Sequence, residues 1–138
     1  MQIIQLGTGK VLWGGKSLYG ADLRGANLYG ADLRGVIGLD AFCILPAGDL
    51  IGYKKLANGQ IATLRIPSDA ARVNAYGSRK CRASYAIVLN GRGIAKYNST
   101  TKYAPGLTIT SDSFDPDPRI VCSHGIHFFI TEQEAKDY

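Results

Sequence analysis

Apolar residues recur every five positions in the first quarter of the chain. Leucine occupies positions 18, 23, 28 and 33, alanine positions 21, 26 and 31, and glycine positions 20, 25, 30 and 35. An α-helix needs a period of about 3.6 residues and a strand a period of about 2, so this stretch fits neither. A fixed-period repeat is typical of stacked architectures, in which each unit buries its apolar face against a neighbour.

Farther along the chain, the apolar pattern predicts strands. Residues 50–56 and 60–66 are apolar, β-branched runs on either side of Asn58-Gly59, and this arrangement strongly predicts a β-hairpin. Residues 80–89 alternate, so we expect a strand with residues 81, 83, 85, 87 and 89 on one face and 80, 82 and 84 on the other.

The last part of the chain predicts two more strands and a helix. Residues 119–122 and 126–130 read as strands separated by Gly125, which fits a bulge. Thr131 and Glu134 have the spacing of a capping box, which predicts a short helix over 132–138.

Residues 16–35 read KSLYG, ADLRG, ANLYG and ADLRG, and they resemble the pentapeptide-repeat family over residues 16–40. The resemblance implies a right-handed square coil with one pentad per side, leucines and alanines pointing inward. It implies that Asp22, Asn27 and Asp32 accept backbone N–H groups, and that four side chains face solvent: Tyr19, Arg24, Tyr29 and Arg34. Four pentads make one turn, which has to be covered by the rest of the chain, by the N-terminal segment or by another protomer.

A second resemblance covers residues 48–138. The strings LRIPSDA (64–70), RKCRA (79–83), FDPDPR (114–119) and CSHGIHFF (122–129) resemble an uncharacterised domain common in bacteriophage genomes, often behind pentapeptide repeats. That domain carries no known activity. We therefore predict two domains, an N-terminal segment with the repeat coil (1–47) and a β-rich phage-type domain (48–138). The predicted fold class is α+β and mostly β: a single turn of right-handed quadrilateral coil joined to an antiparallel sheet domain with a short C-terminal helix.

Composition and charge limit the classes of partner that the protein is expected to bind. The 138 residues include 16 Lys and Arg against 11 Asp and Glu, a net charge of +5. This balance favours anionic partners and argues against a DNA mimic, but it is too modest for a strong duplex-DNA binder. No apolar run is long enough to span a bilayer, so we expect no membrane partner. Three widely spaced cysteines fit a reducing cytoplasm, and the phage resemblance makes it that of an infected bacterial host.

The richest cluster of reactive side chains is Cys122-x-His124-x-x-His127. With Cys81 as a fourth ligand it is a candidate zinc site, but the spacing matches no standard zinc motif, so we expect no metal and no cofactor. Residues 124–129 also compare with the Gly-aromatic strand of ADP-ribosyltransferase-like enzymes. They lack a convincing catalytic glutamate afterwards, and no catalytic residue is predicted.

Basic residues and tyrosines crowd the second part of the chain, a composition that suits a nucleotide because guanidinium groups match phosphate and aromatic rings stack on bases. We predict that Arg79, Lys80, Arg82 and Arg119 contact phosphates. Directional hydrogen bonds are expected from His124 and His127, and stacking from Tyr53 or Tyr85. The favoured hypothesis is a non-catalytic, phage-type protein that sequesters an anionic small molecule such as a nucleotide immune signal.

Two alternatives belong to other classes. One is a protein–protein module that docks on a host target through the repeat surface of Tyr19, Arg24, Tyr29 and Arg34. The other is a nucleotide-processing, ADP-ribosyltransferase-like enzyme. Because ligand pockets are often completed at subunit boundaries, we also expect that the protein can form a homo-oligomer.

Overall fold

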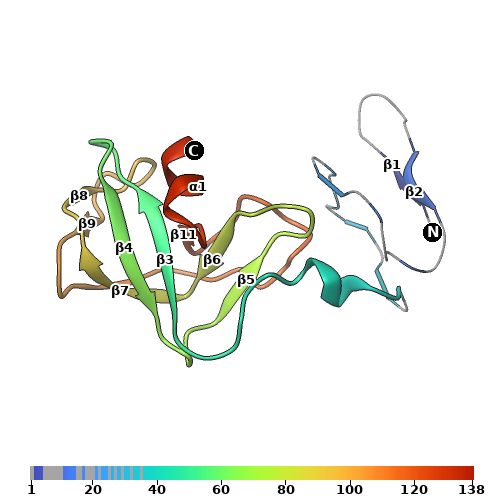
Figure 1. The fold of residues 1–138 in the computed structure, drawn as a ribbon, viewed down its shortest axis with the longest axis horizontal. Coiled ribbons are helices and arrows are strands. Elements are labelled where there is room, and N and C mark those ends of the chain that lie inside the picture. The colour runs from blue at the N-terminus through green and yellow to red at the C-terminus, as the bar shows by residue number, and fades with distance from the viewer. Residues whose placement is uncertain are drawn as a thin grey trace.

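A computed structural model describes residues 2–4, 11–14, 17, 21, 23, 24, 26, 28, 30, 31, 33, 34 and 36–138, with only the backbone of 2–4 and 11–14. Several residues of the predicted repeat lie outside this set: Leu18, Tyr19, Asp22, Asn27, Tyr29 and Asp32. Figure 1 shows β1 (Gln2–Ile4) and β2 (Val11–Gly14), an antiparallel pair, at the opposite end of the molecule from β8 (Gly93–Ile94) and β9 (Lys102–Tyr103).

The β-rich domain is built from antiparallel sheets. A four-stranded sheet has the order β10 (Thr108–Thr110), β7 (Tyr85–Asn90), β4 (Ile61–Ile66), β3 (Leu50–Lys55). A three-stranded sheet has the order β11 (Ile126–Phe128), β6 (Cys81–Ala83), β5 (Arg72–Asn74), and β8 pairs with β9. The prediction of a mostly β chain with antiparallel sheets is therefore confirmed.

The hairpin predicted around Asn58-Gly59 is present as β3 and β4, paired from Leu50↔Ile66 to Lys55↔Ile61. Gly59 has a φ of 83°, a conformation that glycine adopts without steric penalty. Along β4 every second residue is buried, and Ala62, Leu64 and Ile66 face the main core.

The expectation of one continuous strand over 80–89 is wrong. The segment is two strands, β6 and β7, that belong to different sheets and meet at Ser84. Ser84 bonds to Ala71 on one side, while its carbonyl accepts from Ser111 on the other, which turns the chain from one sheet into the next. The alternation changes phase there, so Ala86 and Val88 are buried and Leu89 is exposed.

The strand expected over 119–122 is also absent; these residues form a loop. Two backbone groups of this segment have side-chain partners in place of a neighbouring strand, because Arg119 N donates to the Asp117 carboxylate and Ile120 O accepts from the Arg82 guanidinium. Gly125, with a φ of 149°, precedes β11, and a Cβ there would lie 2.9 Å from the Cβ of Arg82.

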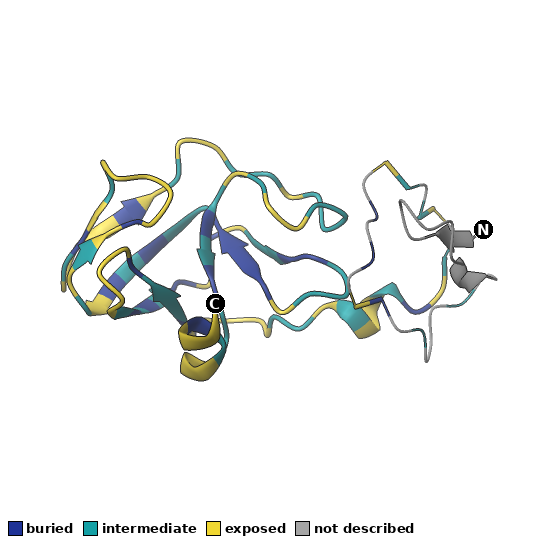
Figure 2. Ribbon diagram, turned by 90° about the horizontal axis from the view of Figure 1, so that it is seen from above, coloured by how far each residue is buried: buried dark blue, intermediate teal, exposed yellow. Residues whose placement is uncertain are grey.

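The predicted C-terminal helix is α1 (Glu132–Asp137), and Thr131 Oγ1 accepts a hydrogen bond from Glu134 N as its N-cap. Ala135 is its buried residue, and Figure 2 shows the exposed face of the helix turned away from the sheets. None of the helices in the described part of the chain has the length and apolar character that crossing a membrane requires.

The described residues of the repeat form a second, smaller apolar cluster. Leu23 and Leu28 are each 2% exposed and pack with Ala26. Backbone bonds recur with the five-residue period, from Ala26 N to Leu23 O, Ala31 N to Leu28 O and Val36 N to Leu33 O. The 3₁₀-helix η1 (Leu39–Phe42) and Tyr76 of the β-rich domain cover this cluster.

Candidate functional site

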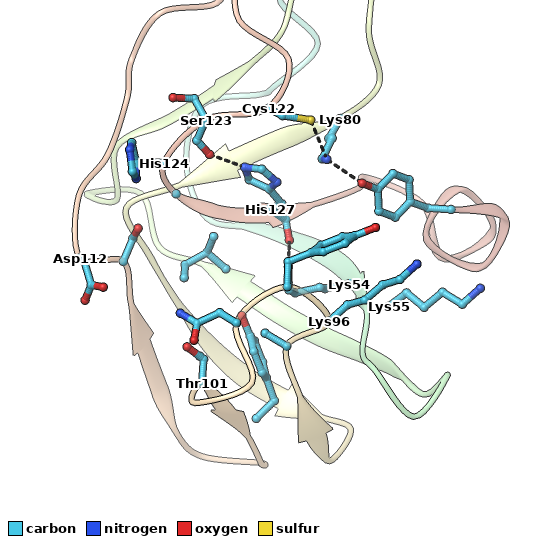
Figure 3. A pocket seen from close by; sticks show the side chains of 18 of the residues that line it. Lys54, Lys55, Lys80, Lys96, Thr101, Asp112, Cys122, Ser123, His124 and His127 are labelled. Carbon is cyan, nitrogen blue, oxygen red and sulfur yellow. Dashed lines mark hydrogen bonds between the residues drawn. The ribbon is translucent and has the colours of Figure 1, made fainter.

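A cavity of about 830 Å³ lies beside β3 and β11 (Figure 3). We call it the lysine pocket, because four lysines line it together with two histidines and a single carboxylate, that of Asp112. Its charged and imidazole residues are Lys54, Lys55, Lys80, Lys96, Asp112, His124 and His127. Its aromatic residues are Tyr97, Tyr103, Phe129 and Tyr138. The volume lies within the range of about 300–1,000 Å³ that small-molecule sites occupy.

Lys54 enters the pocket from the buried side of β3. It follows Leu50 and Gly52 on the face of the strand that packs inward. Phe128 fills the space above Gly52, because a Cβ added there would lie 2.5 Å from Phe128 Cδ2. Lys54 Nζ donates to the backbone carbonyl of His127 at 3.1 Å. Burial, and to a lesser degree the charge of Lys80, lowers the pKa of Lys54 from 10.5 to about 8.

Lys80, the residue before β6, reaches the pocket wall between Cys122 and Tyr138. Its Nζ lies 2.8 Å from Tyr138 Oη, 3.3 Å from Cys122 Sγ and 4.7 Å from the centre of the Tyr138 ring. Burial alone would lower the pKa of Lys80, but the hydrogen bonds to Tyr138 and Cys122 outweigh it and leave the pKa raised. Lys80 is therefore charged near neutral pH, and two hydrogen bonds fix the position of its ammonium group.

His127 projects from β11 into the same pocket (Figure 3). Its Nε2 lies 2.6 Å from the carbonyl oxygen of Ser123, which can only accept, so this nitrogen carries the proton. Burial lowers the pKa of His127 to about 4, and the charges of Lys80, Lys54 and Arg82 act in the same direction. The ring is therefore neutral near pH 7 and presents Nδ1 as an acceptor.

Lys96 and Tyr97 form the outer rim. Tyr97 is 80% exposed, an unusual degree for an aromatic side chain, and Lys96 Nζ lies 5.4 Å from its ring centre. Lys96 also lies 5.9 Å from the ring of Tyr138, which is itself 5.3 Å from the ring of Phe129. The rim thus offers a cationic group and an aromatic face to any molecule that enters.

Of the eight predicted ligand contacts, the structure brings Lys80, His124 and His127 together in the lysine pocket. It places the other five elsewhere. Arg82 is 1% exposed, and its guanidinium donates to the backbone carbonyls of Asp115, Asp117 and Ile120. These bonds hold the loop that leads into the pocket wall.

Arg79 and Arg119 also have protein partners. Arg79 forms a bidentate pair with Glu134 of α1. Arg119 pairs with Asp117 and donates through Nη1 to the carbonyl of Ala31 at 2.6 Å, which joins the β-rich domain to the repeat. Both arginines therefore hold pieces of the fold in place.

The two predicted stacking tyrosines lie outside the lysine pocket. The backbone of Tyr53 donates to and accepts from the backbone of Phe129. Tyr53 precedes Lys54 in β3, so the two side chains lie on opposite faces of the strand. Tyr85, on β7, donates its hydroxyl to Asp69. The aromatic rings that do line the pocket come from other segments.

The four candidate metal ligands are not arranged around a common point that could hold a metal ion. Cys81 is buried with its Sγ toward the carbonyl of Arg79, and burial raises the pKa of its thiol to about 12. Cys122 accepts from Lys80, and His127 binds Ser123. Within residues 36–138 and the other described positions, no three His, Cys, Asp or Glu side chains are placed to hold a metal ion.

On the repeat, Arg24 and Arg34 are exposed, as expected for side chains that face solvent. Tyr19 and Tyr29, the other members of the predicted docking surface, lie outside the described residues.

Sequence reasoning did not select Lys54, Lys96, Tyr97 or Tyr138. A signal for Lys54 was present, because a lysine in phase with Leu50, Gly52 and Leu56 lies on the buried face of an alternating strand. No comparable signal marked the other three, which reach the pocket from loops and from the end of the described chain.

Comparison with known families supports both resemblances. Residues 11–37 match the model for pentapeptide repeats (8 copies), and residues 41–135 match a family of unknown function, DUF5758. No curated protein and no solved structure gives a significant match. The chain therefore belongs to the DUF5758 family and carries pentapeptide repeats ahead of that domain.

Proposed function

We propose that the protein binds an anionic small molecule of nucleotide size in the lysine pocket and holds it without transforming it. The observation that carries the proposal is the charge of the pocket, where four lysines face a single carboxylate. No ion pair with a carboxylate is formed by Lys54, Lys80 or Lys96 among the described residues. An anionic ligand would supply the counter-charge that the protein does not.

The aromatic groups favour a ligand that carries a ring. Tyr97 and Tyr138 lie beside Lys96 and Lys80, so a phosphate on an ammonium group would leave an attached base within reach of a ring face. The exposed Tyr97 has a face available for stacking, which for a base is worth about 1–3 kcal/mol.

The placement of Asp112 and His127 does not favour acid–base catalysis in the pocket. Asp112, the pocket's carboxylate, is exposed, and the Nε2 proton of His127 is bound to Ser123. A general acid–base pair would need two such groups directed at one reacting atom.

Binding is tested by thermal shift with ADP and with a cyclic dinucleotide. A ligand that binds only the folded protein raises its Tm by mass action. Lys96→Glu should abolish the shift, while Lys102→Glu, which changes an exposed lysine outside the pocket lining, should preserve it. Equal shifts in both variants, or none in the parent protein, would show that the pocket is not an anion site.

The stacking role has its own test. Tyr97→Ala should weaken ADP binding by roughly tenfold or more, which corresponds to the loss of one stacking contact. The affinity for inorganic pyrophosphate, which has no base, should stay unchanged. A variant that loses both ligands equally would indicate that Tyr97 shapes the charged wall instead of contacting the base.

We further propose that the biological role of this binding is sequestration, in the cytoplasm of an infected bacterial host, of a nucleotide immune signal. Support comes from the resemblance to phage domains and from a pocket suited to capture. Mass spectrometry of small molecules released by heating, after purification from cells that make such signals, should recover one intact. A chemically altered product would favour the nucleotide-processing enzyme.

We infer that the repeat is one turn of a square coil that caps the β-rich domain. The parallel bridge between Ser17 and Ile37, four pentads apart, and the buried Leu23 and Leu28 support one pentad per side. Native mass spectrometry tests whether the coil also joins protomers. If Arg24→Glu removed function and Lys96→Glu did not, the docking hypothesis would replace capture.

A further inference from the structure

The lysine pocket contains an amine whose surroundings differ from those of an ordinary surface lysine. Lys54 Nζ lies against the backbone carbonyl of His127, on the wall that also holds Lys80. Among the described residues no carboxylate pairs with it, and the burial of β3 removes much of its solvation. The burial, the charge of Lys80 and the lack of a carboxylate partner disfavour the ammonium form, whereas the hydrogen bond to the His127 carbonyl favours it.

We propose that Lys54 is a nucleophilic amine that captures anionic ligands bearing an aldehyde or ketone as a reversible imine. The proposal rests on the proposed function, since the neighbouring lysines would bring the ligand's anionic group into the pocket. A nucleoside diphosphate that carries a reducing sugar is the ligand class that combines this carbonyl with the size of the cavity.

The chemistry balances without any further reactant. The ammonium group first releases a proton to solvent, and the neutral nitrogen attacks the carbonyl carbon. A carbon–nitrogen bond forms while the carbon–oxygen π pair moves to oxygen. The nitrogen then releases one proton to solvent and the oxygen takes one up, which gives the neutral carbinolamine. The carbinolamine then loses one water to give the imine, and addition of water reverses the sequence. No oxidation or reduction occurs, so the ligand is released unchanged.

The depressed pKa of Lys54, about 8, supports this role. Near neutral pH a lysine with that pKa has a far larger neutral fraction than one near 10.5, although a less basic amine is also a weaker nucleophile. The two effects together leave an expected advantage on the order of tenfold in imine formation over an exposed lysine such as Lys102.

The test uses pyridoxal 5′-phosphate, an aldehyde with a phosphate group, followed by borohydride reduction and peptide mass mapping. Lys54 should acquire the adduct on the order of tenfold faster than Lys102. Lys54→Arg, which keeps the charge, should remove the fast adduct, and Lys102→Arg should not. Labelling of Lys54 no faster than Lys102, or a fast adduct that persists in Lys54→Arg, would overturn the proposal.

Two further arms separate the amine from the anion site. Pyridoxal, which lacks the phosphate, should label Lys54 more slowly than the phosphate ester does, and ADP should protect Lys54. If pyridoxal labels it equally fast and ADP does not protect it, Lys54 is reactive but the pocket is not an anion site. If ADP raises the Tm and Lys54 is not labelled, the anion site stands and the capture proposal is wrong.

Discussion

Lys80 and Arg82 are two residues apart, yet they serve two different regions of the β-rich domain. Arg82 lies under the 115–120 loop, where its guanidinium is bound by three backbone carbonyls. Lys80 reaches the lysine pocket, where it contacts a phenol, a thiol and a ring. The loop region uses its cations to hold the fold, and the pocket leaves its cations facing a cavity.

The same division extends to the other cations. Arg79 and Arg119 form ion pairs with carboxylates, and Arg119 also reaches the repeat. Lys54 and Lys96 contact a carbonyl and an aromatic ring. The planar guanidinium fork suits several simultaneous acceptors, whereas an ammonium group with few protein partners is suited to a ligand. Positive charge alone therefore does not mark the site; what matters is whether the protein already neutralises it.

The largest expected effect comes from the loop region. Arg82→Met removes three hydrogen bonds from a buried guanidinium group to backbone carbonyls, so we expect the free energy of unfolding to fall by about 3–4 kcal/mol in chemical denaturation. Arg65→Met is the matched control, because it breaks only an exposed pair with Asp49 and should change stability by about 0–1 kcal/mol. Similar losses in the two variants would show that the buried fork is not a structural anchor.

Removing a cation from the lysine pocket should instead stabilise the protein. We expect Lys54→Met to raise the free energy of unfolding by about 2 kcal/mol at pH 7, because it removes a half-buried ammonium group. The folded-state pKa lies below the unfolded value, so the penalty is complete below about pH 8 and disappears as the pH rises to 10.5. Denaturation at a series of pH values measures the difference, and a variant less stable than the parent at pH 7 contradicts it.

His127 gives a prediction of intermediate size. Its folded-state pKa, about 4, lies below the unfolded value of 6.5, so this group's contribution to stability is present above pH 6.5 and is lost as the pH falls to 4. We expect that loss to be about 2 kcal/mol. The ring resonances of His127 should titrate with a midpoint near 4 in NMR spectra, and a midpoint above 6 would show that the ring is solvated.

The smallest effect should come from the contact between the two domains. Arg119→Ala removes the bond to Ala31 O and the pair with Asp117, and we expect a loss of about 1 kcal/mol. Amide hydrogen exchange should accelerate at Ala31, in the repeat, and stay unchanged at Leu64 in the main sheet. Equal acceleration at both sites would mean that Arg119 supports the whole domain and not the contact with the repeat.

Local signals in the sequence predicted the local structure. Asn58-Gly59 located the β3–β4 hairpin, Thr131 and Glu134 located α1, and the five-residue period identified the repeat. Each of these depends on residues a few positions apart. The break at Ser84 was not predicted, because it depends on partners at Ala71 and Ser111 that only the folded chain brings together.

The site was less predictable for the same reason. The sequence indicated a basic, tyrosine-rich domain, but the acceptors that bind Arg82 lie 33–38 residues away along the chain. Those distant carbonyls decide that Arg82 is structural, while its neighbour Lys80 faces the cavity. Only the inward phase of Lys54 on β3 could have been noticed beforehand.

Anion binding by the lysine pocket is tested most directly by titrating isotope-labelled protein with ADP and following the backbone amides by NMR. We predict that the largest shifts occur at residues 54–55, 80, 96–97 and 122–127, which line the cavity, and that they saturate together. Shifts confined to residues 21–37 of the repeat, or no shift at all, would contradict an anion site in the pocket.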